Sequence, residues 1–294
     1  MSVHYIKTGY ERARSRPRLA AIMYAANLAM GLLLSIPILI AFSQATELSG
    51  YSDQMAEGFD LALWADLFES SGPLLPTLVA QLMWVLPILF VWKMGSSAGL
   101  IHAQSEGGSR SFWKGFGQHT GKATVLGMLY MIPTLVWIIL VVLVATVLST
   151  VLTGEVGSFW VQFVFSPLAL FLGIAFIDMM HDFGRIELVL GKKGIMDSWF
   201  SGMKWPLHSG NANSIYLGWM MFGLLFLVLP FMLDLSLGGL FLAFIVQQIL
   251  LLGRSFITVG WISSEVVFFQ EMFPELADDT DDKSVSDAEL GQGI

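Results

Sequence analysis

The sequence of 294 residues has no cysteine, and only 13% of its residues are charged. Without cysteine the chain cannot form disulfides, thiolate metal sites or a cysteine nucleophile. Its charged content is far below the about 25% that is typical of soluble globular domains. It also has no nucleotide-binding glycine loop, helix-turn-helix or metal-finger motif, so we expect no nucleic-acid partner. With 55% hydrophobic residues, this composition indicates a membrane protein.

Long runs without charged residues produce this composition. The first run covers residues 19–42, and at about 1.5 Å per residue it can cross a hydrocarbon core of about 30 Å. It is longer than the apolar region of a secretory signal peptide, so we interpret it as a retained anchor. The other predicted spans are 74–92, 123–152, 156–177, 215–233 and 235–273. We therefore predict an all-α membrane protein with six transmembrane helices, the last of which is too long for the bilayer alone.

Basic residues are missing from every loop on one side of this predicted threading. All 15 Lys and Arg fall in the N-terminal segment, the 93–122 loop, the 178–213 loop and the C-terminal region, where Arg254 is included. The opposite loops carry only acids among their charged residues. Because cytoplasmic loops of membrane proteins are enriched in Lys and Arg, we expect a multi-pass protein of the bacterial inner membrane with both termini in the cytoplasm.

This threading divides the chain into three regions. Residues 1–18 are predicted to be a basic cytoplasmic tail, 19–273 a six-span membrane domain, and 274–294 an acidic disordered tail. Between the first two spans, apolar residues recur every fourth position, which predicts a surface helix on the outer side. These residues are Met55, Phe59, Leu63 and Leu67.

The two inner loops resemble each other. Each has a glycine at the end of the preceding span (Gly99 and Gly184), an aromatic pair before a second glycine, and a final His, hydroxyl residue and Gly. We predict a parallel repeat of helices 2–3 and 4–5, with short cytoplasmic interfacial helices. Aromatic and basic side chains are typical of headgroup depth, so we expect them to act as interfacial anchors. The expected anchors are Trp113, Lys114, Trp199, Lys204 and Trp205.

One part of the pattern resembles a known group of proteins. A span with a small, Gly-rich end is followed by Asp178, Gly184, Arg185 and the stretch 186–194, with a weaker copy around Gly99. This pattern resembles uncharacterised bacterial six-helix integral membrane proteins, which are similar to the membrane domain of some glycerophosphodiester phosphodiesterases. The resemblance extends over residues ~20–270. It implies a fold and an inner-membrane location but no activity, because catalysis in those phosphodiesterases belongs to a separate soluble domain.

The most unusual polar cluster comprises Asp178, His181, Asp182 and Arg185. It loosely resembles the acidic motif of CDP-alcohol phosphatidyltransferases, whose aspartates hold a divalent metal. Here the first two acids are four residues apart instead of three, and Ser201 stands where a final Asp is needed. We therefore favour an ion pair between Asp182 and Arg185, three residues apart on one helix. Similarly, the G-x-S-x-G sequence of residues 95–99 is better explained by close helix packing than by a serine nucleophile.

These features predict a structural, regulatory or accessory role, without a catalytic site, metal or cofactor. The expected partners are the lipid bilayer and another membrane or cytoplasmic protein that binds the interfacial helices or the acidic tail. A second hypothesis is a transporter or permease-like subunit for a neutral or lipid-like solute, with Gln81, Gln162 and Gln247 along its pathway. A third is a divalent-metal-dependent enzyme similar to the CDP-alcohol phosphatidyltransferases.

Overall fold

The computed structural model of the full chain describes residues 2–47, 62, 74–152, 154–232 and 239–274. The predicted outer surface helix and the acidic tail from residue 275 onward lie outside these residues. The chain divides into two compact units, residues 22–93 and the remainder. The first contains most of one helix and the first part of another, and the second contains all the other elements.

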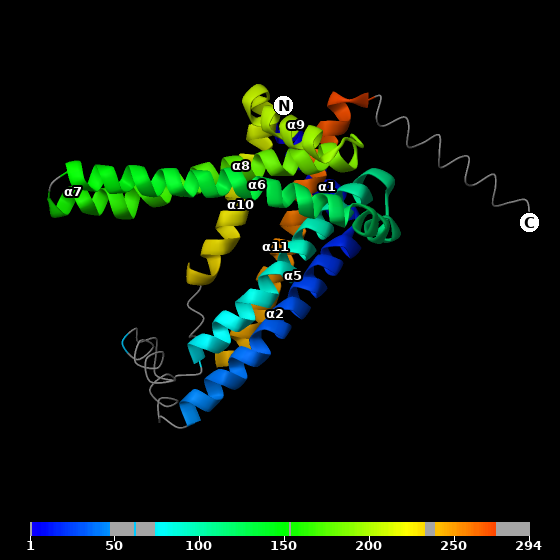
Figure 1. Cartoon of the computed structure of the whole chain (residues 1–294). Coiled ribbons are helices and arrows are strands. Elements are labelled where there is room, and N and C mark those ends of the chain that lie inside the picture. Colours follow the sequence, from blue (N-terminus) through cyan, green and yellow to red (C-terminus); the bar gives the residue numbers. More distant parts are fainter. Residues whose placement is uncertain (1, 48–61, 63–73, 153, 233–238, 275–294) are drawn as a thin grey trace, which may run out of the picture. The chain divides into compact units, whose positions relative to one another are not determined.

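All the regular structure in the described residues is helical, and Figure 1 shows its order along the chain. Because apolar runs dominate the sequence, most of these helices are long. The elements are α1 (Ser2–Ser15), α2 (Pro17–Glu47), α5 (Leu74–Glu106), α6 (Ser109–Val151), α7 (Glu155–Phe159), the π-helix η1 (Trp160–Phe165), α8 (Ser166–Val189), α9 (Ile195–His208), α10 (Gly210–Met232) and α11 (Gly239–Met272).

Six helical stretches are long and apolar enough to cross a membrane, as the sequence predicts. Several of these helices are longer than the bilayer requires. At about 1.5 Å per residue, the 43 residues of α6 extend about 65 Å and the 34 residues of α11 about 51 Å. A hydrocarbon core is only about 30 Å thick, so these helices must continue well beyond it.

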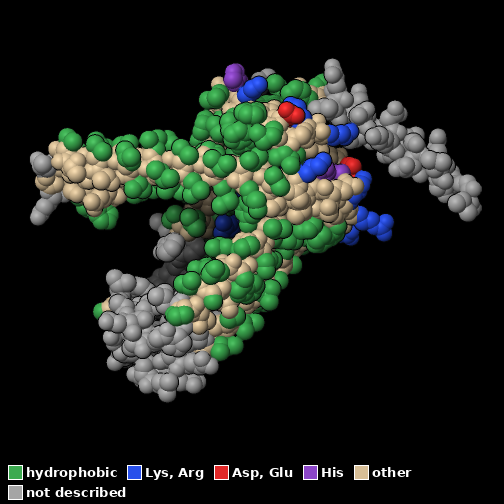
Figure 2. Space-filling view, in the orientation of Figure 1, with side chains coloured by type: hydrophobic (Ala, Val, Ile, Leu, Met, Phe, Trp, Pro, Cys, Tyr) green, Lys and Arg blue, Asp and Glu red, His purple; other side chains and the backbone are tan. Residues whose placement is uncertain are grey.

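Helices α6 and α8 run antiparallel and form a hairpin closed by α7 and η1 (Figure 1). Trp137 Nε1 donates a hydrogen bond to the carbonyl of Ala169, 3.1 Å away, across the hairpin. Only 6% of the apolar stretch of either arm is buried. On the face shown in Figure 2, hydrophobic side chains cover this hairpin. An apolar surface of this kind is what lipid tails accept.

The densest packing in the larger unit lies where these helices extend past their apolar stretches. We call this region the packed end and define it as α1, α9 and residues 94–130, 178–189, 210–219 and 255–272. Phe112, Phe183, Phe268 and Ile215 are almost completely buried within it. The hydrophobic core of this unit is therefore built at one end of the spanning helices.

Residues 2–15 are not an extended tail, because they form helix α1, which packs against α11. Tyr5, Gly9 and Ala13, four residues apart, form its buried face. A side chain at Gly9 would approach the carbonyl of Gly260 to 2.7 Å, so the glycine permits the close crossing. The final part of α11 is thus packed against another helix of this unit.

The two inner loops of the proposed repeat differ in the structure. In the second loop, α9 is a separate helix, and extended backbone at Ser209 separates it from α10. In the first loop, the corresponding residues belong to α6, which continues without a break through His119 and Gly121. Only the second loop therefore contains the predicted short helix as an independent element.

Candidate functional site

The predicted cluster lies at the end of α8, within the packed end. Its residues lie on one side of the helix, since Asp178, His181, Asp182 and Arg185 follow a spacing of three, four and seven residues. His181, Asp182 and Arg185 are each less than a tenth exposed. This side of α8 therefore faces the protein interior and not water.

The two aspartates of the cluster have different partners. Asp182 forms a buried ion pair with Arg185, as the spacing predicts. Asp178 accepts a hydrogen bond from the Tyr216 hydroxyl of α10 at 3.1 Å. The first contact is made within α8. The second joins α8 to α10, and its two residues are 38 positions apart in the sequence.

A third carboxylate belongs to the same region and comes from α11. Glu265 is only 1% exposed and accepts a hydrogen bond from Trp261 Nε1 at 2.7 Å. Asp178 and Glu265 both interact electrostatically with Arg185. Glu265 is not part of the cluster predicted from the sequence, because it lies on a different predicted span. Its position in the apolar run after Arg254 is the signal that it would be buried.

Tyr130 of α6 completes the site. Its hydroxyl lies 3.0 Å from the carbonyl oxygen of Met180 and 3.1 Å from that of Trp199, and its ring lies 4.9 Å from that of His181. One tyrosine thus joins α6, α8 and α9. Nothing in the local sequence pattern distinguishes it from other tyrosines near a membrane interface.

Glu187, one turn beyond the cluster, joins α8 to α9. Its Oε1 accepts hydrogen bonds from Ser201 Oγ at 2.8 Å and from Trp205 Nε1 at 3.1 Å. Lys193 Nζ lies 2.8 Å from its Oε2, and the Glu187 side chain is only 3% exposed. Ser201, which stands where the phosphatidyltransferase motif needs an aspartate, is therefore part of a structural contact.

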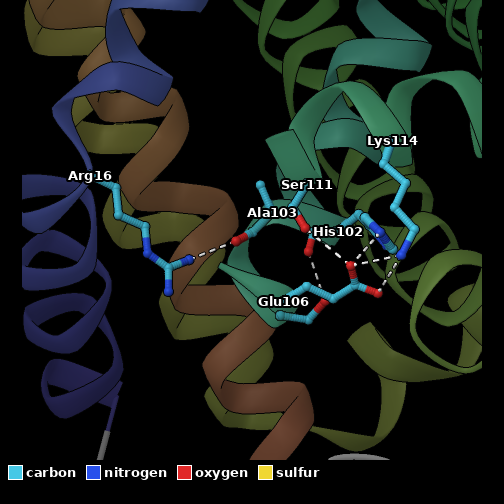
Figure 3. A network of polar contacts seen from close by, with 7 residues as sticks. Arg16, His102, Ala103, Glu106, Ser111 and Lys114 are labelled. Carbon is cyan, nitrogen blue, oxygen red and sulfur yellow. Dashed lines mark hydrogen bonds and ion pairs between the residues drawn. The ribbon is translucent and has the colours of Figure 1, made fainter. Parts of the chain in front are cut away.

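A second polar network joins α5 to the start of α6 (Figure 3). Glu106 Oε2 lies 3.0 Å from His102 Nε2 and 3.2 Å from Lys114 Nζ, and it accepts a hydrogen bond from Ser111 Oγ at 3.1 Å. From the end of α1, Arg16 donates to the carbonyl of Ala103 at 2.7 Å (Figure 3). Burial lowers the pKa of the Arg16 guanidinium.

The predicted anchors occupy two environments. Trp113, Lys114 and Lys204 are exposed, as an interfacial position requires. Trp199 is half-buried. Trp205 is also half-buried: its ring stacks on that of Phe183 with centroids 5.3 Å apart, and its indole donates to Glu187.

The G-x-S-x-G sequence of α5 is a packing surface against α6. Ser97 is buried and donates a hydrogen bond to the carbonyl of Met94 at 2.9 Å. A side chain at Gly99 would come within 2.8 Å of the carbonyl of Phe112. These small residues let the two helices approach, which is the interpretation that the sequence favoured.

Neither alternative function gains a site from the described residues. Within them, no three His, Cys, Asp or Glu side chains lie close enough together to hold a metal ion. Gln162 and Gln247 are exposed on the sides of their helices, and Gln81 is half-buried in the smaller unit. The chain matches no protein-family model, no curated protein and no solved structure.

Proposed function

We propose that this chain is a six-span protein of the bacterial inner membrane with a structural, regulatory or accessory role. Its packed end would lie in the cytoplasm and present a rigid helical platform beside the membrane. The resemblance to the membrane domain of some glycerophosphodiester phosphodiesterases remains a prediction, and it agrees with a role without catalysis in this chain.

The observation that carries this proposal is the use of polar side chains at the packed end. The carboxylates most suited to chemistry are engaged in contacts inside the protein: Asp182 pairs with Arg185 within α8, whereas Asp178 binds Tyr216 of α10 and Glu187 binds α9. Such contacts fix helix positions and leave these groups little freedom to bind a substrate. The charge distribution adds support, because the Lys and Arg of the larger unit lie mainly at this end.

The similarity of the two inner loops also supports a repeat. In the second loop, a side chain at Gly202 would approach the Met180 carbonyl to 2.5 Å and Gly184 Cα to 2.8 Å. In the first loop, a side chain at Gly115 would approach His102 Cγ to 2.8 Å. A glycine after the aromatic pair thus permits a close helix approach in both loops, although it faces Gly184 in the second loop and His102 in the first, and only the second crossing helix is separate.

Fusion reporters test the membrane orientation. Alkaline phosphatase is active only in the periplasm, so a fusion after Ile294 should be inactive. A fusion at Gly154, in the loop between α6 and α7, should be active. The reverse pattern would refute the proposed orientation, and activity at both positions would refute six spans.

A transferase assay with the purified full-length chain tests the non-catalytic role. We expect no transfer from a CDP-alcohol with Mg²⁺ or Mn²⁺ present. Asp178→Asn is the informative variant, because it removes the carboxylate charge while its amide oxygen can still accept the Tyr216 hydrogen bond, so it should cost only about 0.5–1.5 kcal/mol of stability. Wild-type transfer that Asp178→Asn abolishes, with its melting temperature nearly retained, would establish the enzyme instead.

A further inference from the structure

Whereas an ordinary amphipathic helix buries its large apolar side chains, the buried face of helix α9 consists of small residues. Its buried residues are the small Ser198, Gly202 and Pro206, which recur every fourth position. Three of its large apolar residues, Met196, Phe200 and Leu207, are 50%, 53% and 68% exposed, while Trp199 and Trp205 are half-buried. A helix that lay against its own protein and water would show the opposite distribution.

The exposed apolar residues form a single stripe. At 100° per residue, positions 196, 200, 203 and 207 all lie within about 60° of one another around the helix axis. Met203 is half-buried at the edge of the stripe. Lys204 is exposed directly beside it, and Lys192 and Lys193 occupy the turn that precedes α9. An apolar stripe with lysines alongside is therefore presented outward.

We propose that this stripe of α9 docks into the headgroup layer of the surrounding membrane and binds anionic phospholipid. Helix α9 connects α8 to α10, and both contain stretches that can span a membrane, so its two ends are held near one membrane surface. Figure 2 shows hydrophobic, basic and histidine side chains at the α9 end, with an acidic side chain among them. This inference rests on the proposed function, since it requires the packed end to lie beside a membrane.

The chemistry of the stripe favours lipid over a protein partner. Interfacial helices insert apolar side chains to the depth of the acyl boundary, while adjacent lysines reach the phosphates. The side chain of Lys204 has this arrangement beside Phe200 and Leu207. Asp197 is the only acidic residue within α9 and lies in its first turn, where it favours the helix dipole. Lys193 is paired with Glu187, so Lys192 and Lys204 stand against the single exposed Asp197, and the net charge beside the stripe is positive and complements anionic headgroups.

The chain has no cysteine, so a single introduced cysteine can be labelled at a chosen position to test lipid docking by α9. Phe200→Cys and Leu207→Cys would each be labelled with an environment-sensitive fluorophore in the full-length protein, reconstituted into vesicles of phosphatidylcholine with or without phosphatidylglycerol. Lipids that carry a nitroxide near the headgroup would act as quenchers. The matched control is Val3→Cys, because Val3 is apolar, 74% exposed and part of α1 at the same end.

We expect strong quenching and a blue shift at positions 200 and 207, and little change at position 3. Adding Lys204→Gln should reduce the docked-to-undocked ratio about fivefold in anionic vesicles and little in neutral ones. Equal quenching at positions 3 and 200, or no effect of anionic lipid, would overturn the inference. A blue shift that needs other membrane proteins would assign the surface to a protein partner and equally overturn it.

A fourth label separates this result from the proposed membrane placement. Ile139 is 63% exposed in the apolar part of α6. If Ile139→Cys is quenched by mid-chain nitroxides and position 200 is not quenched by headgroup nitroxides, the membrane protein stands and lipid docking by α9 fails. If neither label is quenched, the proposed function itself fails.

Discussion

The packed end contains two turns that are each fixed by a glutamate, but the two glutamates lie in different environments. Glu106 holds α5 to α6 with a side chain that is 32% exposed, and Glu187 holds α8 to α9 with a side chain that is 3% exposed. Their turns also differ: Gly107 and Gly108 provide the positive φ values in the first, whereas Lys192 adopts a φ of 50° in the second.

This difference shows how the energetics depend on burial. An exposed ion pair is screened by water, and its contribution is about 0–1 kcal/mol. When a buried carboxylate is removed, the donors that were bonded to it lose their acceptor, and water does not readily reach the site to take its role. The stability of the second turn should therefore depend on Glu187, whereas that of the first should depend mainly on the positive φ values of Gly107 and Gly108. Four substitutions can test this comparison.

The largest expected effect is that of Glu187→Ala. It leaves Ser201 and Trp205 without their shared acceptor, whereas Lys193 is 41% exposed and can be hydrated, so the free energy of unfolding should fall by about 2–3 kcal/mol. The matched variant Glu106→Ala should cost below about 1 kcal/mol. Thermal unfolding of both variants in the same detergent measures the difference. Equal losses of stability would show that the burial of the glutamate does not determine how much it contributes to its turn.

Close helix crossings should give the next largest effect. Gly202→Ala places a methyl group 2.5 Å from both the Met180 carbonyl and the Tyr130 hydroxyl, so it should destabilise by about 1–3 kcal/mol. Gly117→Ala is the control, since its added methyl group would meet nothing within 4 Å. The control should be neutral or stabilise by up to about 1 kcal/mol. A neutral Gly202→Ala would contradict the tight crossing of α8 and α9.

Tyr130→Phe should have a smaller effect that is specific to the second turn. It removes the hydroxyl between the Met180 and Trp199 carbonyls and should cost about 0.5–1.5 kcal/mol. Tyr10→Phe is the control, because Tyr10 is 48% exposed. Equilibrium unfolding in a mixed-micelle titration has the required sensitivity. Identical unfolding curves for Tyr130→Phe and the wild type would show that the Tyr130 hydroxyl does not stabilise the contact between α6, α8 and α9.

Lys114→Met should have the smallest effect. Its Nζ lies 3.2 Å from Glu106, but the lysine side chain is 55% exposed. We expect a loss of about 0–1 kcal/mol that disappears at high salt, since salt screens exposed charges. Melting temperatures at low and high salt test this. A large loss that persists in high salt would make the first turn as dependent on its ion pair as the second.

The apolar helices could be predicted from sequence because their signal is local. Each predicted span lies mainly within an observed helix, and α11 extends beyond bilayer thickness as expected. The Asp182–Arg185 pair was also predictable, because its two residues are three positions apart on one helix. Long-range partners were not: Tyr216 reaches Asp178 only because the tertiary fold brings this part of α10 to α8. Trp205 is another such case, since its ring stacks on Phe183 of α8 and is half-buried there.

The sequence by itself determined that this chain forms long apolar helices, with its basic residues confined to one end of the predicted threading. Hydropathy and charge are properties of consecutive residues, so they need no knowledge of neighbours in space. Only the tertiary structure decided which polar groups are buried, which helix faces remain outward and where the core lies. Those properties depend on helix crossings, and a crossing set by a few glycines, such as Gly202 against Gly184, leaves too weak a trace in sequence to be recognised alone.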